Sequence, residues 1–324
     1  MILTSCRTGT KRTSKNRLCQ DRYSVTSDGQ TTILAVADGH GSPQYVRSGL
    51  GARIACQVAK RVLLDDSIPA ENRSRAIKSM FDQMVQKHMR LRPFTESERA
   101  KIQSLEDLRY AYGTTLIAAK LTASDSFFLH LGDGELHAIR QDGRFLPRLN
   151  PEEGDYTGSV CSLVQTSACE HIYTAWYPEP MAAVIMYTDG YDCRQAYPWA
   201  LVDLCTHPDP ASQIDEILDQ GNGSGDDQTL AFYADAAVCT REPYLSGLNQ
   251  ERARCQLTQD IERLTTSVAE LEAYLKIMLR KMEHLSGDAL EAKRGIVMPR
   301  MELYREQTQK LRELRDVLNS MNRE

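Results

Sequence analysis

The stretch Thr32-Ile-Leu-Ala-Val-Ala-Asp38-Gly39-His40 is a run of apolar residues that ends in an aspartate and a glycine. Such a run predicts a buried strand, and the glycine lets the chain turn and approach a ligand closely. Two other apolar runs end in the same way, one at Asp133-Gly134 and one at Asp189-Gly190. Because strand ends hold carboxylates rigidly, these three ends predict a site for divalent cations that prefer oxygen ligands.

Composition indicates an ordinary globular chain. It has 324 residues, of which 41% are hydrophobic and 26% are charged, so one large domain with an accessory segment is expected. The formal net charge of −5 does not indicate nucleic-acid binding. Nine cysteines without a C-x-x-C pattern predict reduced thiols. No signal peptide or membrane-spanning stretch is evident, so we expect a cytoplasmic protein without a membrane partner.

Residues 1–240 combine many short strand patterns with helical patterns. The helical patterns cover residues 44–64 and 70–91, and two shorter ones lie near residues 199–205 and 211–220. Thr95 and Glu98 have the spacing of a capping box, which predicts a helix in this polar stretch. The strands, on short connections, favour antiparallel sheets covered by helices over regular βαβ winding. The predicted strands are residues 23–26, 31–37, 114–121, 126–131, 135–140, 159–165, 172–176, 183–187 and 228–233.

Residues 245–324 have a different pattern and are predicted to form a helical extension. From Leu257 to Leu285, apolar residues recur at alternating spacings of four and three, which is typical of a coiled-coil seam. Ser286-Gly287 and the stretch from Gly295 to Pro299 are expected to interrupt the helix, and a second seam ends at Met321. A helical hairpin, an intermolecular coiled coil through residues 257–321 and one amphipathic helix packed on the domain all fit this pattern.

Six short motifs, in order, resemble the metal-dependent type 2C serine/threonine protein phosphatases. The resemblance spans residues 9–235 approximately, and the Cys-Gln-Asp motif with Gly154-Asp155-Tyr156 resembles a bacterial branch of the family. The six motifs are Cys19-Gln20-Asp21, Asp38-Gly39-His40-Gly41, Gly113-Thr114-Thr115, Gly132-Asp133-Gly134, Thr188-Asp189-Gly190 and Asp226-Asp227-Gln228-Thr229.

The resemblance implies an α+β fold with four layers, in which two antiparallel sheets lie between helix pairs, and a metal site at one edge. It implies two Mn²⁺ or Mg²⁺ ions, bridged by Asp38 and bound by the Gly39 carbonyl, with Asp189 and Asp226 completing one ion. Asp21 would act near the ions, partly through water, and Asp133 would serve a third, weaker ion.

The implied reaction is hydrolysis of phosphoserine or phosphothreonine by a hydroxide that bridges the metal ions. His40 follows Gly39 directly and is expected to protonate the leaving alkoxide as a general acid. A pair of cations ~3.5–4 Å apart suits such an in-line displacement. Carboxylates crowded in this way would repel one another strongly without cations.

Two departures from the family pattern are evident. Gln20 stands where a glutamate is usual, so one ion is expected to rest on water or to bind more weakly. An upstream arginine that holds the substrate phosphate is replaced by Asn16. Arg12 and Arg17, with Lys15 nearby, carry suitable charge for this role, and solvated surface charge is the alternative for each.

The sequence leads to two hypotheses of different classes. The first is a metal-dependent phosphoprotein phosphatase whose tail dimerises it or docks it to a kinase or another partner. The second is a pseudophosphatase or scaffold that acts through its coiled coil, which Gln20 and the missing arginine favour. Zinc-type histidine spacing, phosphate-binding glycine loops and G-x-S-x-G are absent from the sequence.

Overall fold

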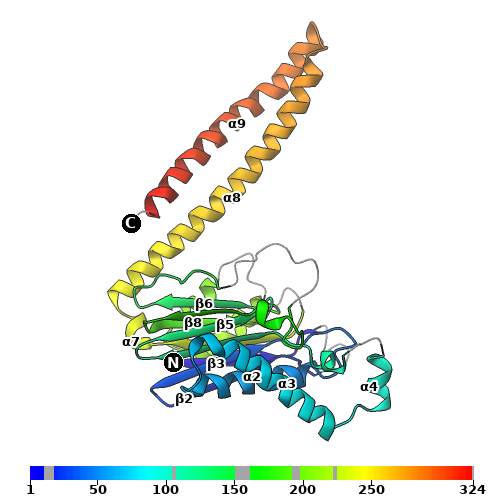
Figure 1. The fold of residues 1–324 in the computed structure, drawn as a ribbon. Coiled ribbons are helices and arrows are strands. Elements are labelled where there is room, and N and C mark those ends of the chain that lie inside the picture. The colour runs from blue at the N-terminus through cyan, green and yellow to red at the C-terminus, as the bar shows by residue number, and fades with distance from the viewer. Residues whose placement is uncertain (11–17, 104–106, 150–160, 192–197, 222–224, 323–324) are drawn as a thin grey trace. The chain divides into compact units, whose positions relative to one another are not determined.

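The computed structural model divides into two compact units, residues 1–247 and 248–324, and each is described by itself (Figure 1). The structure describes all residues except 11–17, 104–106, 150–160, 192–197, 222–224 and 323–324. The first unit contains both β-sheets, and the second is helical.

Two antiparallel sheets form the centre of the first unit. One has the strand order β1-β9-β8-β6, and the other has the order β2-β3-β4-β5-β7. The strands are β1 (Ile2–Arg7), β2 (Arg22–Ser27), β3 (Thr31–Ala37), β4 (Leu116–Thr122), β5 (Ser126–Leu131), β6 (Glu135–Arg140), β7 (Tyr173–Tyr177), β8 (Met181–Tyr187) and β9 (Gln228–Ala234).

Alternation along the strands separates two hydrophobic cores. In β3, Leu34 and Val36 pack between the sheets against residues such as Val184, whereas Ile33 and Ala35 face the helical layer. Because successive side chains of a strand point to opposite faces, a strand apolar on both faces must be covered on both sides. The apolar run that precedes Asp38 is therefore continuous, because β3 lies between the second sheet and the helices.

Helices cover the outer faces of the sheets. Helices α2 (Ser48–Leu64) and α3 (Arg73–Leu91) pack on the sheet that contains β3, which Figure 1 shows. Near the other sheet, Gln228 of β9 donates a hydrogen bond to the Leu218 carbonyl of α6. The other short helices are η1 (Ala70–Asn72), α4 (Glu96–Lys101), η2 (Leu108–Tyr112), η3 (Ala168–Glu170), α5 (Trp199–Asp203), α6 (Pro210–Gln220) and α7 (Ala236–Cys239).

The predicted four-layer α+β class is confirmed, but two local predictions differ from the structure. Ile2–Arg7 is not among the predicted strands but forms β1, an edge strand whose residues are half-buried. The predicted strand at 159–165 is absent from its described part, residues 161–165, where the chain makes turns. The capping box is present, since the Thr95 hydroxyl accepts from the Glu98 N–H and the Glu98 carboxylate accepts from the Thr95 N–H.

The second unit is an antiparallel helical hairpin within one chain. Helix α8 (Glu242–Met282) enters it from the first unit and runs beside α9 (Asp288–Met321) (Figure 1). Leu275, Met278 and Val297 form its buried core. The hairpin turn falls at Ser286-Gly287, as the sequence predicted. The second predicted interruption, at Gly295 to Pro299, does not occur. Helix α9 continues through Pro299, although proline has no N–H to donate to the Gly295 carbonyl.

Among the described residues, no helix combines the length and the apolar character that crossing a bilayer requires. Even the long α8 has charged residues in its last turn.

Candidate metal centre

Five aspartates meet at one edge of the two sheets because of strand direction. Asp38 follows β3, and Asp133 follows β5; both strands are antiparallel to β4 and therefore end at the same edge. Asp21 precedes β2, which is antiparallel to β3. Asp189 follows β8, and Asp226 lies before β9. Because β8 and β9 are antiparallel neighbours, the end of β8 lies beside the start of β9. We call Asp21, Asp38, Asp133, Asp189 and Asp226 the carboxylate edge.

Three of these side chains form a tight group. Asp38, Asp133 and Asp189 each offer a carboxylate oxygen, and these three oxygens lie within 4.8 Å of one another. Asp21 lies within hydrogen-bonding reach of Asp38, and Asp226 is close enough to raise the pKa of Asp133. Carboxylates from both sheets therefore lie close together at this edge, where their like charges repel one another.

The backbone of Asp38 is held by the Gly-Thr-Thr motif. The Asp38 carbonyl accepts from the Thr115 N–H at 2.9 Å and from the Thr114 hydroxyl at 2.7 Å. The Asp38 N–H donates to the Thr115 hydroxyl at 3.0 Å. A Cβ atom on Gly39 would lie 2.7 Å from the Gln20 carbonyl, so only glycine permits this close approach. These contacts leave the Asp38 carboxylate available to a ligand.

Thr188 and Asp227 position Asp21 from the opposite sheet. The Thr188 hydroxyl donates to Oδ2 of Asp21 at 2.7 Å and accepts from the Thr229 N–H at 3.0 Å. The buried Asp227 accepts from the N–H groups of Gly9 and Gln20, at 2.9 and 2.7 Å. Both Asp227 carboxylate oxygens therefore accept hydrogen bonds from backbone N–H groups that are distant in the sequence.

Burial and mutual repulsion raise the pKa values of Asp21, Asp38 and Asp133 at the carboxylate edge. Burial raises the pKa of Asp21 to about 7 and that of Asp133 to about 6. For Asp38, burial and then the charges of Asp21 and Asp189 raise the pKa well above its usual range. Nearby cations would reverse this cost, because they favour the ionised carboxylates.

Buried oxygen atoms at this edge fit a hard divalent cation. Among the described residues, Oδ1 of Asp21, Oδ1 of Asp133 and Oε1 of Gln20 are buried without a hydrogen-bond partner. Leaving a buried polar atom unpaired usually costs about 1–3 kcal/mol. The available donors are carboxylate and carbonyl oxygens, which Mg²⁺ and Mn²⁺ prefer. The residues present therefore fit the divalent ions that the sequence predicted.

His40 follows Asp38 and Gly39 in the sequence and therefore lies next to the carboxylate edge. Its ring packs against Tyr45 with centroids 4.9 Å apart, and the backbone N–H of His40 donates to the Gly113 carbonyl at 3.2 Å. Burial lowers the pKa of His40 to about 4. The imidazole is therefore neutral at pH 7 in the resting site, and the arrival of a negatively charged phosphate would favour its protonation.

Some predicted residues are not placed by the structure. Arg12 and Arg17, predicted to bind phosphate, lie outside the described residues, as does the Gly154–Tyr156 stretch. Gln20 is placed beside the carboxylate edge, and its side-chain NH₂ donates to the Ser48 hydroxyl. The positioning roles of Thr114, Thr115 and Thr188 were not predicted, although all three belong to the quoted motifs.

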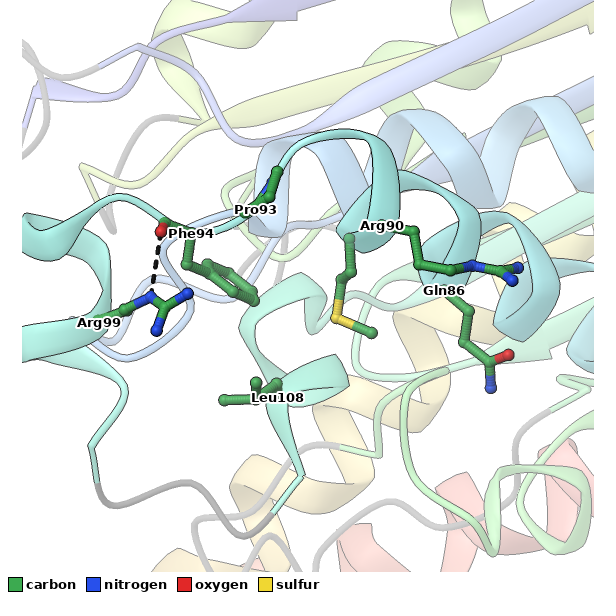
Figure 2. A pocket seen from close by; sticks show the side chains of 7 residues that line it. Gln86, Arg90, Pro93, Phe94, Arg99 and Leu108 are labelled. Carbon is green, nitrogen blue, oxygen red and sulfur yellow. Dashed lines mark hydrogen bonds between the residues drawn. The ribbon is translucent and has the colours of Figure 1, made fainter.

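A separate cavity of about 430 Å³ lies where α3, α4 and η2 approach one another. Figure 2 shows its lining side chains, with Arg99 donating to the Phe94 carbonyl. None of them belongs to the carboxylate edge, and none of the described lining residues is acidic. We therefore take the carboxylate edge as the candidate site. The cavity is lined by Gln86, Met89, Arg90, Pro93, Phe94, Arg99 and Leu108.

Comparison with known proteins agrees with this geometry. A family model described as protein phosphatase 2C matches residues 8–231. The chain therefore belongs to the protein phosphatase 2C family, a class of metal-dependent protein phosphatases. A search of curated proteins gave no match.

Solved structures are similar to this chain at low sequence identity. PppA, a regulatory component of the type VI secretion system in Pseudomonas aeruginosa, is 16% identical over 72% of this chain and 97% of its own, with a TM-score of 0.50. The serine/threonine phosphatase of S. agalactiae is also 16% identical, covering 72% and 99%, with a TM-score of 0.49. A C. elegans sex-determining protein is 16% identical with a TM-score of 0.48; the match covers 72% of this chain but only 64% of that protein.

Proposed function

We propose that this protein hydrolyses phosphoserine and phosphothreonine in protein substrates, using Mn²⁺ or Mg²⁺ ions held at the carboxylate edge. The observation that carries the proposal is the group of Asp38, Asp133 and Asp189, whose oxygens lie within 4.8 Å of one another. Such crowding of like charges is costly in a metal-free protein and is relieved by divalent cations. Family membership supports the general activity.

Each residue of the carboxylate edge has a proposed part. Asp38 would be shared by two ions, with the Gly39 carbonyl, Asp189 and Asp226 as further ligands and Asp21 acting beside them. Asp133 would bind a third ion, and its closeness to Asp38 and Asp189 would place that ion next to the others. When bound, divalent ions would lower the pKa of a water molecule so that it loses a proton to solvent and is available as hydroxide to attack phosphorus, and they would neutralise charge on the phosphoryl group.

His40 is proposed to protonate the leaving serine or threonine oxygen, and Arg12 or Arg17 to bind the phosphate. Because the resting pKa of His40 is about 4, the proton would be acquired with the dianionic substrate. A substrate with a good leaving group needs no such acid. His40→Asn should therefore lower turnover of a phosphothreonine peptide much more than that of p-nitrophenyl phosphate. Equal losses on both substrates would contradict the role of His40.

The decisive activity assay uses a phosphothreonine peptide with added Mn²⁺, and a phosphotyrosine peptide of the same sequence as the control. Phosphate release from the phosphothreonine peptide is expected, together with its loss on chelation. A pseudophosphatase is the second candidate, favoured by Gln20 in place of the usual glutamate. Wild-type protein inert with every divalent metal would support that candidate and contradict the enzyme.

The helical tail is proposed to join two copies of the chain or to dock a partner such as a kinase. Two helices bury only a small core, and large apolar residues on them remain exposed, among them Ile277, Ile296 and Met298. Light scattering of the intact chain is expected to give the mass of a dimer. A version ending at Gly247, which keeps the buried Tyr244, should be a monomer. A monomeric intact chain would contradict self-association and leave partner docking.

A further inference from the structure

Two cysteines distant in sequence meet beside the carboxylate edge. The Sγ atoms of Cys6 and Cys19 lie 3.4 Å apart, and both residues are half-buried. Cys6 belongs to β1, an edge strand of one sheet, and Cys19 lies three residues before β2, an edge strand of the other. A covalent bond between them would join the two sheets.

The surroundings of the pair link it to the candidate metal centre. Sγ of Cys6 lies 3.5 Å from the Asp21 carbonyl, and Sγ of Cys19 lies 3.6 Å from the Arg7 carbonyl. Cys19 is followed directly by Gln20, whose N–H donates to Asp227, and then by Asp21, which accepts from Thr188. Movement of Cys19 is therefore transmitted to Asp21 through a single intervening residue.

Three other described cysteines are less suited to the same reaction. Cys205 and Cys239 also contact one another, but both are buried, with exposed fractions of 4% and 0%. Cys169 is exposed, and no contact between its thiol and another cysteine is found in the described part of the chain. Oxidation requires both access to the oxidant and a second thiol within reach. The Cys6–Cys19 pair combines these conditions.

We propose that Cys6 and Cys19 form an oxidation site that takes a peroxide and becomes a reversible disulfide. One thiolate attacks a peroxide oxygen, the O–O bond breaks, and a sulfenic acid forms as the first water leaves. The second thiol attacks that sulfur, the S–S bond forms, and the sulfenic oxygen leaves as a second water. Overall, two thiols are oxidised by two electrons, and one hydrogen peroxide is reduced to two waters.

The disulfide weakens metal binding at the carboxylate edge; this consequence rests on the proposed function. A disulfide has an S–S length of about 2 Å, so the two sulfurs must move closer than they are in the reduced chain. The bond draws Cys19 toward β1, which lies in the same sheet as β8 and β9; Thr188 and Asp227, next to those two strands, hold Asp21 and Gln20. Asp21 is consequently displaced from its place beside Asp38.

Peptide mapping of the full-length chain tests the bond itself. The reduced protein is treated with one equivalent of hydrogen peroxide, blocked with iodoacetamide and digested with trypsin without reductant. Cleavage after Arg7, Arg17 and Arg22 puts Cys6 and Cys19 on separate peptides, residues 1–7 and 18–22, each with one cysteine. The expected result is one species that joins these peptides and lacks two hydrogens, about 2 Da.

Matched variants decide the assignment. Cys6→Ser and Cys19→Ser should prevent the cross-link, whereas Cys169→Ser should leave it intact. Absence of the cross-link in the wild type, or its appearance at another cysteine pair first, would overturn the proposal. This readout is a mass and does not depend on phosphatase activity, so it stands apart from any failure of the proposed function.

Calorimetric titration with Mn²⁺ tests the consequence. The oxidised chain should bind Mn²⁺ at least about threefold more weakly than the reduced chain, with recovery after dithiothreitol, and Cys6→Ser should show no change with peroxide. A cross-linked chain with unaltered Mn²⁺ affinity would overturn the control of the metal centre. A reduced chain that binds no Mn²⁺ would instead contradict the proposed function.

Discussion

The carboxylate edge and the cluster around Arg47 are both groups of charged side chains withdrawn from water, but their charges are balanced differently. Arg47 uses all five of its N–H donors, on Glu98, Tyr112 and the carbonyls of Arg92 and Pro93, and its guanidinium lies 4.0 Å from the centre of the Phe94 ring. The carboxylate edge instead gathers like charges and leaves buried oxygens unpaired.

This difference separates a structural cluster from a ligand site. The Arg47 cluster fixes α4 against the start of α2, and Arg47 lowers the pKa of Glu98 to about 2. At the carboxylate edge the pKa values of Asp21, Asp38 and Asp133 are raised, so the folded metal-free protein bears an electrostatic cost. Satisfied charges stabilise the fold by themselves, whereas unsatisfied like charges are stabilised by a ligand of opposite charge.

The largest expected effect follows from Asp38→Asn. Removing the carboxylate shared between the ions should lower hydrolysis of a phosphothreonine peptide by at least about 10³-fold, which corresponds to about 4 kcal/mol. The metal-free variant should melt at a higher temperature than the metal-free wild type, because one buried like charge is gone. Parallel activity and thermal-melting measurements check both parts. A variant that loses activity and also stability would contradict the view of this edge as strained.

The next largest effect is the response of stability to pH and metal. Because the folded pKa of Asp21 is about 7 and its unfolded value is near 4, the folded state binds more protons between these pH values. The unfolding free energy of the metal-free protein should therefore fall as pH rises from 4 to 7, by an amount on the order of 4 kcal/mol if Asp21 alone contributed.

Millimolar Mn²⁺ should reverse this loss at pH 7.5. With a Kd ~10 μM, it adds ~2.7 kcal/mol and raises the melting temperature by about 5–10 °C. Scanning calorimetry with and without a chelator measures both effects, and Asp38→Asn serves as the control with a reduced response. A melting temperature that does not change with Mn²⁺ and that rises with pH would contradict metal binding at the carboxylate edge.

The stability contributed by the Arg47 cluster should depend on pH in the opposite direction. Arg47→Ala should lower the unfolding free energy by about 2–3 kcal/mol, because it leaves Glu98 and two carbonyls without their donor. Since the pKa of Glu98 is depressed, its contribution is present above pH ~4 and is lost as pH falls toward 2. Urea unfolding measures the change. Arg144→Ala, at the exposed pair with Asp142, is the control and should cost less than about 0.5 kcal/mol.

A smaller effect is expected at Thr188, which touches Asp21 but is not a proposed ligand. Thr188→Val removes a hydrogen bond that lowers the pKa of Asp21, so this carboxyl should stay protonated to a higher pH. Mn²⁺ affinity should fall about tenfold, more at pH 6.5 than at pH 8. Calorimetric titration at both pH values checks this, and an equal loss at both would indicate a purely structural role.

Much of the candidate site was predictable because its residues end strands whose apolar patterns are strong. The run before Asp38 is buried on both faces, and its continuity in the sequence reflects that burial. Strand β1 was missed because its half-buried residues mix polar and apolar types without strict alternation. The roles of Thr115 and Thr188 depend on partners 77 and 167 residues away, which no local pattern indicates.

In the tail, local periodicity predicted the helices and the turn at Gly287 but left three arrangements open. The same seam can pack within a chain or between chains, and only the contact of residues such as Ser267 with Gln307 identifies the hairpin. Continuation of α9 through Pro299 was not predicted, because proline usually interrupts a helix. Here the helix tolerates the loss of one hydrogen bond while its other contacts persist.

Anomalous diffraction from crystals soaked in Mn²⁺ would show directly whether the carboxylate edge binds metal. At least two manganese peaks are expected between Asp38 and Asp189, each within about 2.0–2.6 Å of carboxylate oxygens. Crystals that contain no manganese at these aspartates, with their oxygens paired to protein groups or turned apart, would contradict this expectation.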